Sequence, residues 1–172
     1  MDVTQKAREV VASAVGAAAK VLPGQRPGAQ PARQTLTIAR PAGEVLAAWR
    51  DPAVVSRLMG DLGRAEAGAA GRWTFSLTTG GGTSVEAELA DGQDAVEFHR
   101  PGERGGEGFL LRVGTRPAPR ELGTEVTCEV APELSAGVGA VPFTLLYRLR
   151  ALLLTGEIPT LGPQPAAREE ER

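Results

Sequence analysis

The most apolar stretch of the chain, residues 142–154, predicts a helix near the C-terminal end. Pro142 suits the first turn of a helix, and Gly156 suits the position just past its end. Between them only Arg148 and Arg150 carry charge. A helix that is apolar on nearly every side is normally buried, and this one is too short to cross a bilayer. The rest of the chain is therefore expected to cover it.

Upstream of this helix, stretches of alternating apolar and polar residues predict half-buried strands. In residues 72–79, for example, Trp73, Phe75 and Leu77 point to one side. The strands expected from this pattern are residues 34–40, 72–79, 84–90, 94–100, 109–113 and 124–130. One polar face and short connections indicate an antiparallel meander of six to seven strands. We expect an α+β fold in which this curved sheet wraps the C-terminal helix and leaves an apolar cavity between the two.

Two short helices are predicted directly after the first strand. Pro41 opens the first of them, which runs through Trp49. Asp51 is a suitable N-cap for the second helix, with Pro52 at its first position and Met59 near its end. Both segments carry one apolar face, so both are expected to pack on the sheet.

The two ends of the chain differ from this central part. Residues 1–22 carry an apolar stripe at helical spacing and predict an amphipathic helix. Residues 23–32 have the composition of a linker, residues 33–157 form the predicted domain, and residues 158–172 predict a disordered tail. Because Glu9 adjoins a weakly hydrophobic run, a secretory signal is not favoured over a helix that docks on the domain or a partner. Weak contact with a membrane surface or a protein through residues 2–22 is a further expectation.

The amino-acid composition argues against several classes of function. The net charge is -2, the isoelectric point is about 5.6 and aromatic residues make up 4% of the chain, so nucleic-acid binding is not expected. With one cysteine and one histidine, most zinc sites and all intramolecular disulfides are excluded. No metal and no cofactor is predicted. The cysteine usage fits a cytoplasmic protein, with peripheral membrane association as the alternative, and the richness in Ala, Gly, Arg and Pro suggests a bacterial source.

Four segments together carry a resemblance to a known family. Residues 35–49 read as a strand, then Pro41, then Glu44 and Val45, then Trp49. The short helix at 51–59 follows, the sequence Gly-Thr-Glu-Val-Thr stands at 123–127, and Gly-Glu-Ile-Pro-Thr stands at 156–160. In their order these segments resemble the START-like (Bet v 1-like, SRPBCC) superfamily. Within it they are most similar to the polyketide cyclase/dehydrase-like group that includes coenzyme Q-binding START proteins. The resemblance covers about residues 33–162.

The resemblance implies a helix-grip fold with a hydrophobic cavity between the sheet and the final helix. Relatives bind lipids, quinones or polyketides there, and a minority catalyse cyclisation or dehydration. The segment from Val130 to Gly156 is shorter here than in relatives of this branch. On such a fold the ligand-binding cavity would be lined by Trp49, Met59, Trp73, Phe75, Phe98, Phe109, Leu111, Phe143, Tyr147 and Arg150.

Arg150 is the one charged residue in this set. It lies about 200° around the helix from Arg148, so the two arginines cannot share one solvent-exposed face. One of them is expected to reach the cavity, where it would bind an acidic or carbonyl group of a ligand. The alternatives are a snorkelling side chain at the cavity rim or a salt bridge to the sheet.

Catalytic chemistry has few candidates. Phe98 takes the inward position of its strand, so His99 is expected to face outward, away from any catalytic role. Cys128 is expected to be a small buried residue, because no base or positive group is evident beside it. The glycine-rich stretches match neither a phosphate-binding loop nor a dinucleotide fingerprint. No catalytic residue is predicted.

Three functions follow in order of preference. The first is binding or carriage of a hydrophobic small molecule or lipid, quinone-like or polyketide-like, in an internal cavity. The second is a polyketide cyclase/dehydrase-type enzyme, for which Arg150 with Tyr147 is the candidate pair. The third is a ligand-free interaction module that uses the N-terminal helix. A wide cavity with converging polar groups would favour the enzyme, a dry apolar cavity the carrier, and a cavity filled by side chains the module.

Overall fold

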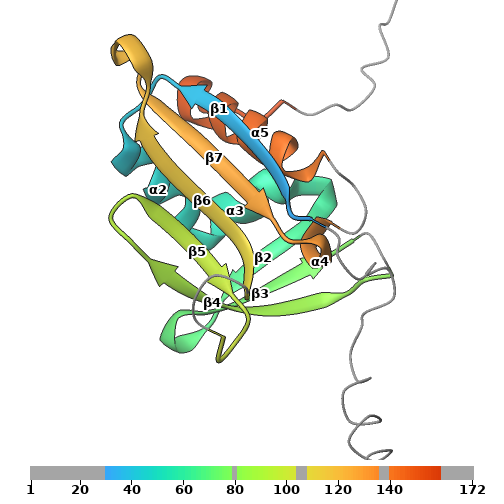
Figure 1. Cartoon of the computed structure of the whole chain (residues 1–172). Helices are drawn as coiled ribbons and strands as arrows, with labels where there is room; N and C mark the ends of the chain where they lie inside the picture. Colours follow the sequence, from blue (N-terminus) through green and yellow to red (C-terminus); the bar gives the residue numbers. More distant parts are fainter. Residues whose placement is uncertain (1–29, 79–80, 104–107, 136–139, 160–172) are drawn as a thin grey trace, which may run out of the picture.

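A computed structural model describes residues 30–78, 81–103, 108–135 and 140–159. In this part of the chain seven antiparallel strands form one curled sheet in the order β1-β7-β6-β5-β4-β3-β2 (Figure 1). The strands are β1 (Ala32–Ile38), β2 (Gly63–Ala67), β3 (Arg72–Leu77), β4 (Ser84–Asp91), β5 (Ala95–His99), β6 (Phe109–Pro117) and β7 (Thr124–Val130). The predicted helix-grip architecture, a curved sheet wrapped around a C-terminal helix, is confirmed.

The strand β2, which was not among the six strands expected from alternation, pairs with β3 at one edge of the sheet. Its five residues place only Ala65 in the core, so it carries little of the alternation that marks the other strands. Contact with the preceding helix stabilises it. The Ser56 hydroxyl donates to the Ala65 carbonyl at 2.6 Å and accepts from the Ala65 amide at 2.9 Å. This edge strand is therefore defined by tertiary contacts more than by its own sequence.

The two short helices follow β1 as predicted. They are α2 (Ala42–Arg50) and α3 (Pro52–Met59), and the Asp51 side chain caps α3 by accepting from the amides of Ala53 and Val54. Their apolar faces point into the concave side of the sheet, where Trp49 is completely buried. At the C-terminal end of α2, Arg50 binds Asp91 at the end of β4 through two nitrogens, with a shortest distance of 2.6 Å.

The C-terminal helix α5 (Val141–Thr155) follows the short helix α4 (Pro132–Ser135) and packs along β1 and β7 (Figure 1). Gly156 ends α5 in a left-handed conformation, and its amide donates to the Leu152 carbonyl at 2.8 Å. One face of α5 is buried, but the opposite face is not. Phe143 and Tyr147 are 51% and 48% exposed. The expectation that the domain covers this helix on nearly every side is therefore wrong for the residues described.

A β-bulge between Phe98 and His99 interrupts the register of β5 with β6. Across from it, Leu110 and Leu111 are both buried although they are neighbours in sequence. Phe109 pairs with His99, and its ring lies 5.1 Å from the Arg112 guanidinium. The bulge therefore shifts Phe109 out of the inward series that simple alternation predicts.

The predictions for residues 1–22, for most of the linker 23–32 and for nearly all of the tail 158–172 concern residues outside the described part. No helix within that part is both long and apolar enough to span a membrane.

Candidate functional site

The space between the sheet and α5 contains a small apolar cavity of about 30 Å³. It is lined by Trp49, Val55, Met59, Leu62, Phe75, Leu77, Leu111, Val130, Leu134, Val141 and Leu145. Such a volume has room for one or two water molecules, whereas ligand pockets measure about 300–1,000 Å³. A ligand-sized cavity was expected between the sheet and the final helix, but side chains fill most of this space.

Three aromatic rings occupy much of the concave side of the sheet. Trp73 and Phe75 each meet Phe98 edge to face, with centroids 4.9 Å and 5.3 Å apart. The rings of Trp73 and Phe75 stack at 6.2 Å. Of these three candidates, only Phe75 lines the cavity. Trp73 and Phe98 are buried core residues that hold β3 and β5 together.

Trp49 is the distinctive residue of the cavity wall. It is completely buried, and its indole N–H has no hydrogen-bond partner among the described residues. The other ten lining side chains are aliphatic, aromatic or thioether groups, so among the described residues Trp49 is the one lining residue whose side chain carries a hydrogen-bond donor. A buried donor without a partner costs about 1–3 kcal/mol. Trp49 therefore retains one unused hydrogen-bond donor in apolar surroundings.

The structure divides the ten predicted cavity residues into four groups. Trp49, Met59, Phe75 and Leu111 line the cavity, and Trp73 and Phe98 lie in the core beside it. Phe109 stacks beneath Arg112, as the bulge requires. The last group, Phe143, Tyr147 and Arg150, is exposed on α5 and does not line the cavity, because the helix turns its leucine face to the sheet.

The two arginines of α5 lie on different faces of the helix, and neither lines the cavity. Arg148, and not Arg150, turns inward, and its side chain is 14% exposed. Its guanidinium donates to the carbonyls of Leu58 and Met59 at 3.0 Å and 2.6 Å, and to the Asp61 carboxylate at 2.5 Å. Arg148 therefore caps the C-terminal end of α3 and fastens it to α5. This contact lowers the pKa of Asp61, chiefly through the hydrogen bond from Arg148.

Gly60 makes the approach of Arg148 possible. Its φ of 54° lies in the left-handed region, and a Cβ there would be 2.9 Å from an Arg148 nitrogen. The sequence does not reveal this contact, because the two residues lie far apart in the chain.

His99 shares the outer side of the sheet with Glu97, but it is only 4% exposed, so the expectation of a solvent-facing histidine is wrong in that respect. Its Nε2 lies 2.8 Å from a Glu97 oxygen, and its Nδ1 has no partner among the described residues. Glu97 also accepts from Arg112 at 2.6 Å, and Arg112 approaches Glu129 at 3.8 Å. These contacts form a charge network across β5, β6 and β7.

Cys128 is fully buried in β7, as predicted. Burial raises the pKa of its thiol far above the ordinary value, and the neighbouring Glu129 adds to the effect. The thiolate that a catalytic cysteine needs is therefore disfavoured. Over the described ranges, no group of three or more His, Cys, Asp or Glu side chains is placed to hold a metal ion.

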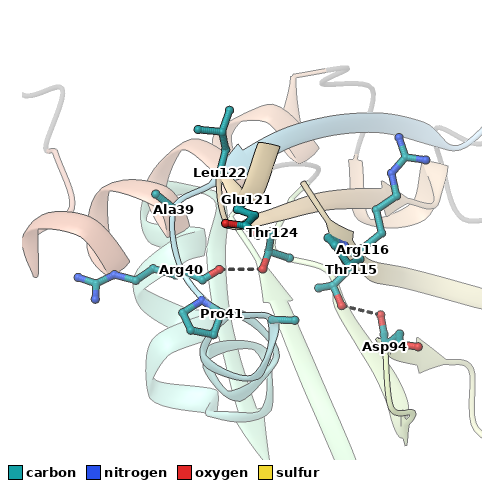
Figure 2. A pocket seen from close by; sticks show the side chains of 12 residues that line it. Ala39, Arg40, Pro41, Asp94, Thr115, Arg116, Glu121, Leu122 and Thr124 are labelled. Atoms are coloured by element: carbon teal, nitrogen blue, oxygen red, sulfur yellow. Dashed lines mark hydrogen bonds between the residues drawn. The ribbon is translucent and has the colours of Figure 1, made fainter. Parts of the chain in front are cut away.

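A second hollow, which the sequence did not predict, is a surface groove of about 800 Å³ at one end of the sheet (Figure 2). It is lined by residues 39–42, 115–117 and 121–124 and by Asp94. Two of its hydroxyls are used internally: Thr124 donates to the Arg40 carbonyl at 2.7 Å, and Thr115 donates to the Asp94 carbonyl at 3.0 Å. Two arginines also line the groove: Arg116 donates to Glu125 at 3.0 Å, whereas the Nε of Arg40 has no partner among the described residues.

Comparison with known proteins supports the fold. No protein-family model matches the sequence, and no curated protein is significantly similar to it. Among solved structures, DR_A0006 from Deinococcus radiodurans is similar with a TM-score of 0.57 at 24% identity, over 75% of this chain and 100% of that chain.

Two further structures are similar with TM-scores of 0.50 at 15% identity. They are SSP2350 from Staphylococcus saprophyticus, over 77% of this chain and 97% of that chain, and CV1439 from Chromobacterium violaceum, over 72% and 97%. Similarity at these identities shows a shared fold, here a curled antiparallel sheet with a C-terminal helix, and does not show a shared activity.

Proposed function

We propose that this chain is a START-like protein that binds a hydrophobic small molecule or lipid between the sheet and α5. We further propose that the ligand carries a hydrogen-bond acceptor such as a quinone or polyketide carbonyl. The order of elements supports the family: one strand, two short helices, an antiparallel meander and a C-terminal helix. The neighbouring structures support the fold on which such binding occurs.

The observation that carries the proposal is the unpartnered indole N–H of Trp49, a residue that lines an apolar cavity. Buried tryptophans usually satisfy this donor, so its isolation needs an explanation. A ligand carbonyl oxygen that accepts a hydrogen bond from the Trp49 N–H would remove the unfavourable free energy of the unpaired donor. The apolar wall would meanwhile bury the rest of the ligand.

A ligand larger than one or two waters has to displace side chains. Leu134 of α4 and Val141 and Leu145 of α5 form one wall of the cavity. We infer that binding separates these residues from the sheet, whereas the contact of Arg148 with α3 keeps the middle of α5 in place.

Two probes that share one carbon skeleton, with and without carbonyl oxygens, test the proposal: 2,3-dimethyl-1,4-naphthoquinone and 2,3-dimethylnaphthalene. Titration calorimetry of the full chain should show binding of the quinone. Trp49→Phe removes the N–H and keeps an aromatic ring, and it should weaken quinone binding about fivefold, since one neutral hydrogen bond contributes about 1 kcal/mol. Its effect on the hydrocarbon should be small.

The matched control is Trp73→Phe, which makes the same chemical change in a core ring outside the cavity wall. It should leave the preference for the quinone unchanged. Equal weakening by both variants would assign the effect to general packing and not to the indole donor. Failure of both probes to bind up to their limits of solubility, with no co-purified molecule in native mass spectra of protein from its own host, would overturn the proposal.

The small cavity also favours a second function, a ligand-free interaction module. A core filled to within about 30 Å³ needs no ligand for its stability, and α5 exposes Phe143 and Tyr147. For the enzyme alternative, the candidate pair Tyr147 and Arg150 is exposed on α5 and is not in the cavity wall. The calorimetric test separates carrier from module, because the module predicts no binding of either probe.

A further inference from the structure

The exposed side of α5 carries an apolar stripe that the described domain does not cover. Phe143, Tyr147 and Leu154 are 51%, 48% and 39% exposed. Their spacing of four and seven residues, with Arg150 between the last two, places all four on one helical face, here called the outer stripe. The rings of Phe143 and Tyr147 stack at 6.0 Å. Large apolar side chains that gather on one exposed face indicate a docking surface.

The N-terminal part of the chain enters the domain beside this helix. Ala32, the first residue of β1, pairs with Val130. Val130 lines the same small cavity as Val141 and Leu145 of the first turns of α5. The chain therefore enters β1 at the end of the sheet where α5 begins, and β1 continues along the helix (Figure 1).

The length of the connection allows an intramolecular contact. Residues 23–31 can extend about 30 Å, whereas the fifteen residues of α5 span about 22 Å. The segment before the linker can thus reach any point of the outer stripe. Because it is tethered, it also has a high effective concentration there.

The sequence of residues 2–22 has a matching surface. Its apolar positions recur at helical spacing and are small: Val3, Ala7, Val10, Val11, Ala14, Val15 and Ala18. Small residues let a helix approach bulky rings closely. The other end of the chain is a poorer candidate, because residues 160–172 offer one leucine and three consecutive glutamates.

We propose that residues 2–22 form a helix whose small apolar stripe packs on the outer stripe of α5. The N-terminal segment then completes the coverage of α5, with the sheet on one side and this helix on the other. The interaction is intramolecular, so it forms independently of protein concentration.

Tyr147 is the only tyrosine of the chain and provides a built-in probe. We suggest measuring its nitration by tetranitromethane in the full-length protein, with the product located by peptide mass spectrometry. Ala14→Asp puts a charge in the centre of the small stripe, whereas Gln5→Asp puts the same charge about 180° away on the helix. Ala14→Asp should speed nitration about fivefold, which corresponds to a docking free energy of about 1 kcal/mol, and Gln5→Asp should match the wild type.

Each alternative occupant gives a different result. Equal nitration in all three proteins, at the rate of a free tyrosine amide, would overturn the proposal and leave the stripe uncovered. Protection that grows with protein concentration and survives Ala14→Asp would also overturn it, in favour of a second copy of the chain. Protection that appears only with anionic phospholipid vesicles would assign the stripe to a membrane surface. Near-UV circular dichroism of Trp49 and Trp73 checks that the variants keep the domain intact.

Discussion

Both faces of α5 carry large apolar side chains, but the surroundings of the two faces differ. On the inner face, Leu145, Leu146 and Leu149 are at most 4% exposed and pack against the sheet. On the outer face, Phe143 and Tyr147 are about half exposed. Core packing accounts for the inner face, but nothing within the described domain accounts for the outer one. The apolarity of this helix therefore exceeds what packing within the described domain requires.

The two arginines of α5 also differ in their surroundings. Arg148 caps α3 through two carbonyls and Asp61, whereas Arg150 is exposed, with no hydrogen bond or ion pair among the described residues. Arg148 and Arg150 therefore contribute differently to the fold, although they carry the same charge and lie only two positions apart.

The largest effect should separate the two faces directly. Leu146→Ala removes a completely buried side chain and should lower the free energy of unfolding by about 2–5 kcal/mol through lost burial and the cavity left behind. Leu154→Ala on the outer face should cost about 0.5–1 kcal/mol. Urea titrations of both variants provide the comparison. Equal losses would mean that the outer face is packed as tightly as the inner one.

A smaller effect should separate the arginines. Arg148→Met keeps much of the aliphatic stem but leaves the α3 carbonyls and Asp61 without their donor. It should destabilise the protein by about 2–3 kcal/mol, since hydrogen bonds from a charged group contribute about 1.5–3 kcal/mol. Arg150→Met should stay within about 0.5 kcal/mol of the wild type. Thermal and urea unfolding of the pair would show whether the capping contact, and not charge alone, stabilises the fold.

Much of the fold could be predicted from the sequence, because it depends on local patterns. Alternation revealed most of the sheet, and Asp51 with Pro52 marked the start of α3. Two features escaped the pattern. The strand β2 has a single inward residue, Ala65, and the bulge at Phe98 and His99 shifts Phe109 away from the inward series.

The candidate site was less predictable, because it depends on tertiary packing. An all-round apolar helix gives no period from which to choose its buried face, so Phe143, Tyr147 and Arg150 could not be placed. The size of the cavity depends on how the side chains that line it pack together, which no spacing reveals. The role of Arg148 depends on α3, about ninety residues earlier in the chain.

A double-mutant cycle of Tyr147 and Ala14 tests whether residues 2–22 contact the outer stripe. Tyr147→Ser in the full-length chain should cost about 1 kcal/mol if residues 2–22 pack on the ring, and much of that loss should vanish in the Ala14→Asp background. The coupling energy, obtained from four urea titrations, measures the contact itself. A coupling near zero, with a full loss in both backgrounds, would mean that Tyr147 acts only within α5.

The smallest effect concerns the pH dependence of the Arg148 contact. The pKa of Asp61 is lowered in the folded protein, so its contribution to stability is present above its unfolded pKa of about 3.9 and is lost as the pH falls through the folded value. The Asp61 side chain is 79% exposed, so solvent screening limits this contribution to a few tenths of a kcal/mol. Asp61→Asn should therefore be slightly less stable than the wild type at pH 6, with a difference that shrinks below pH of about 4 and in high salt. The two carbonyl contacts of Arg148 do not titrate, so Arg148→Met should remain destabilised at both pH values. If the destabilisation caused by Arg148→Met also disappeared at low pH, the contact between Arg148 and α3 would depend chiefly on the ion pair with Asp61. The two carbonyl contacts would then contribute little to stability.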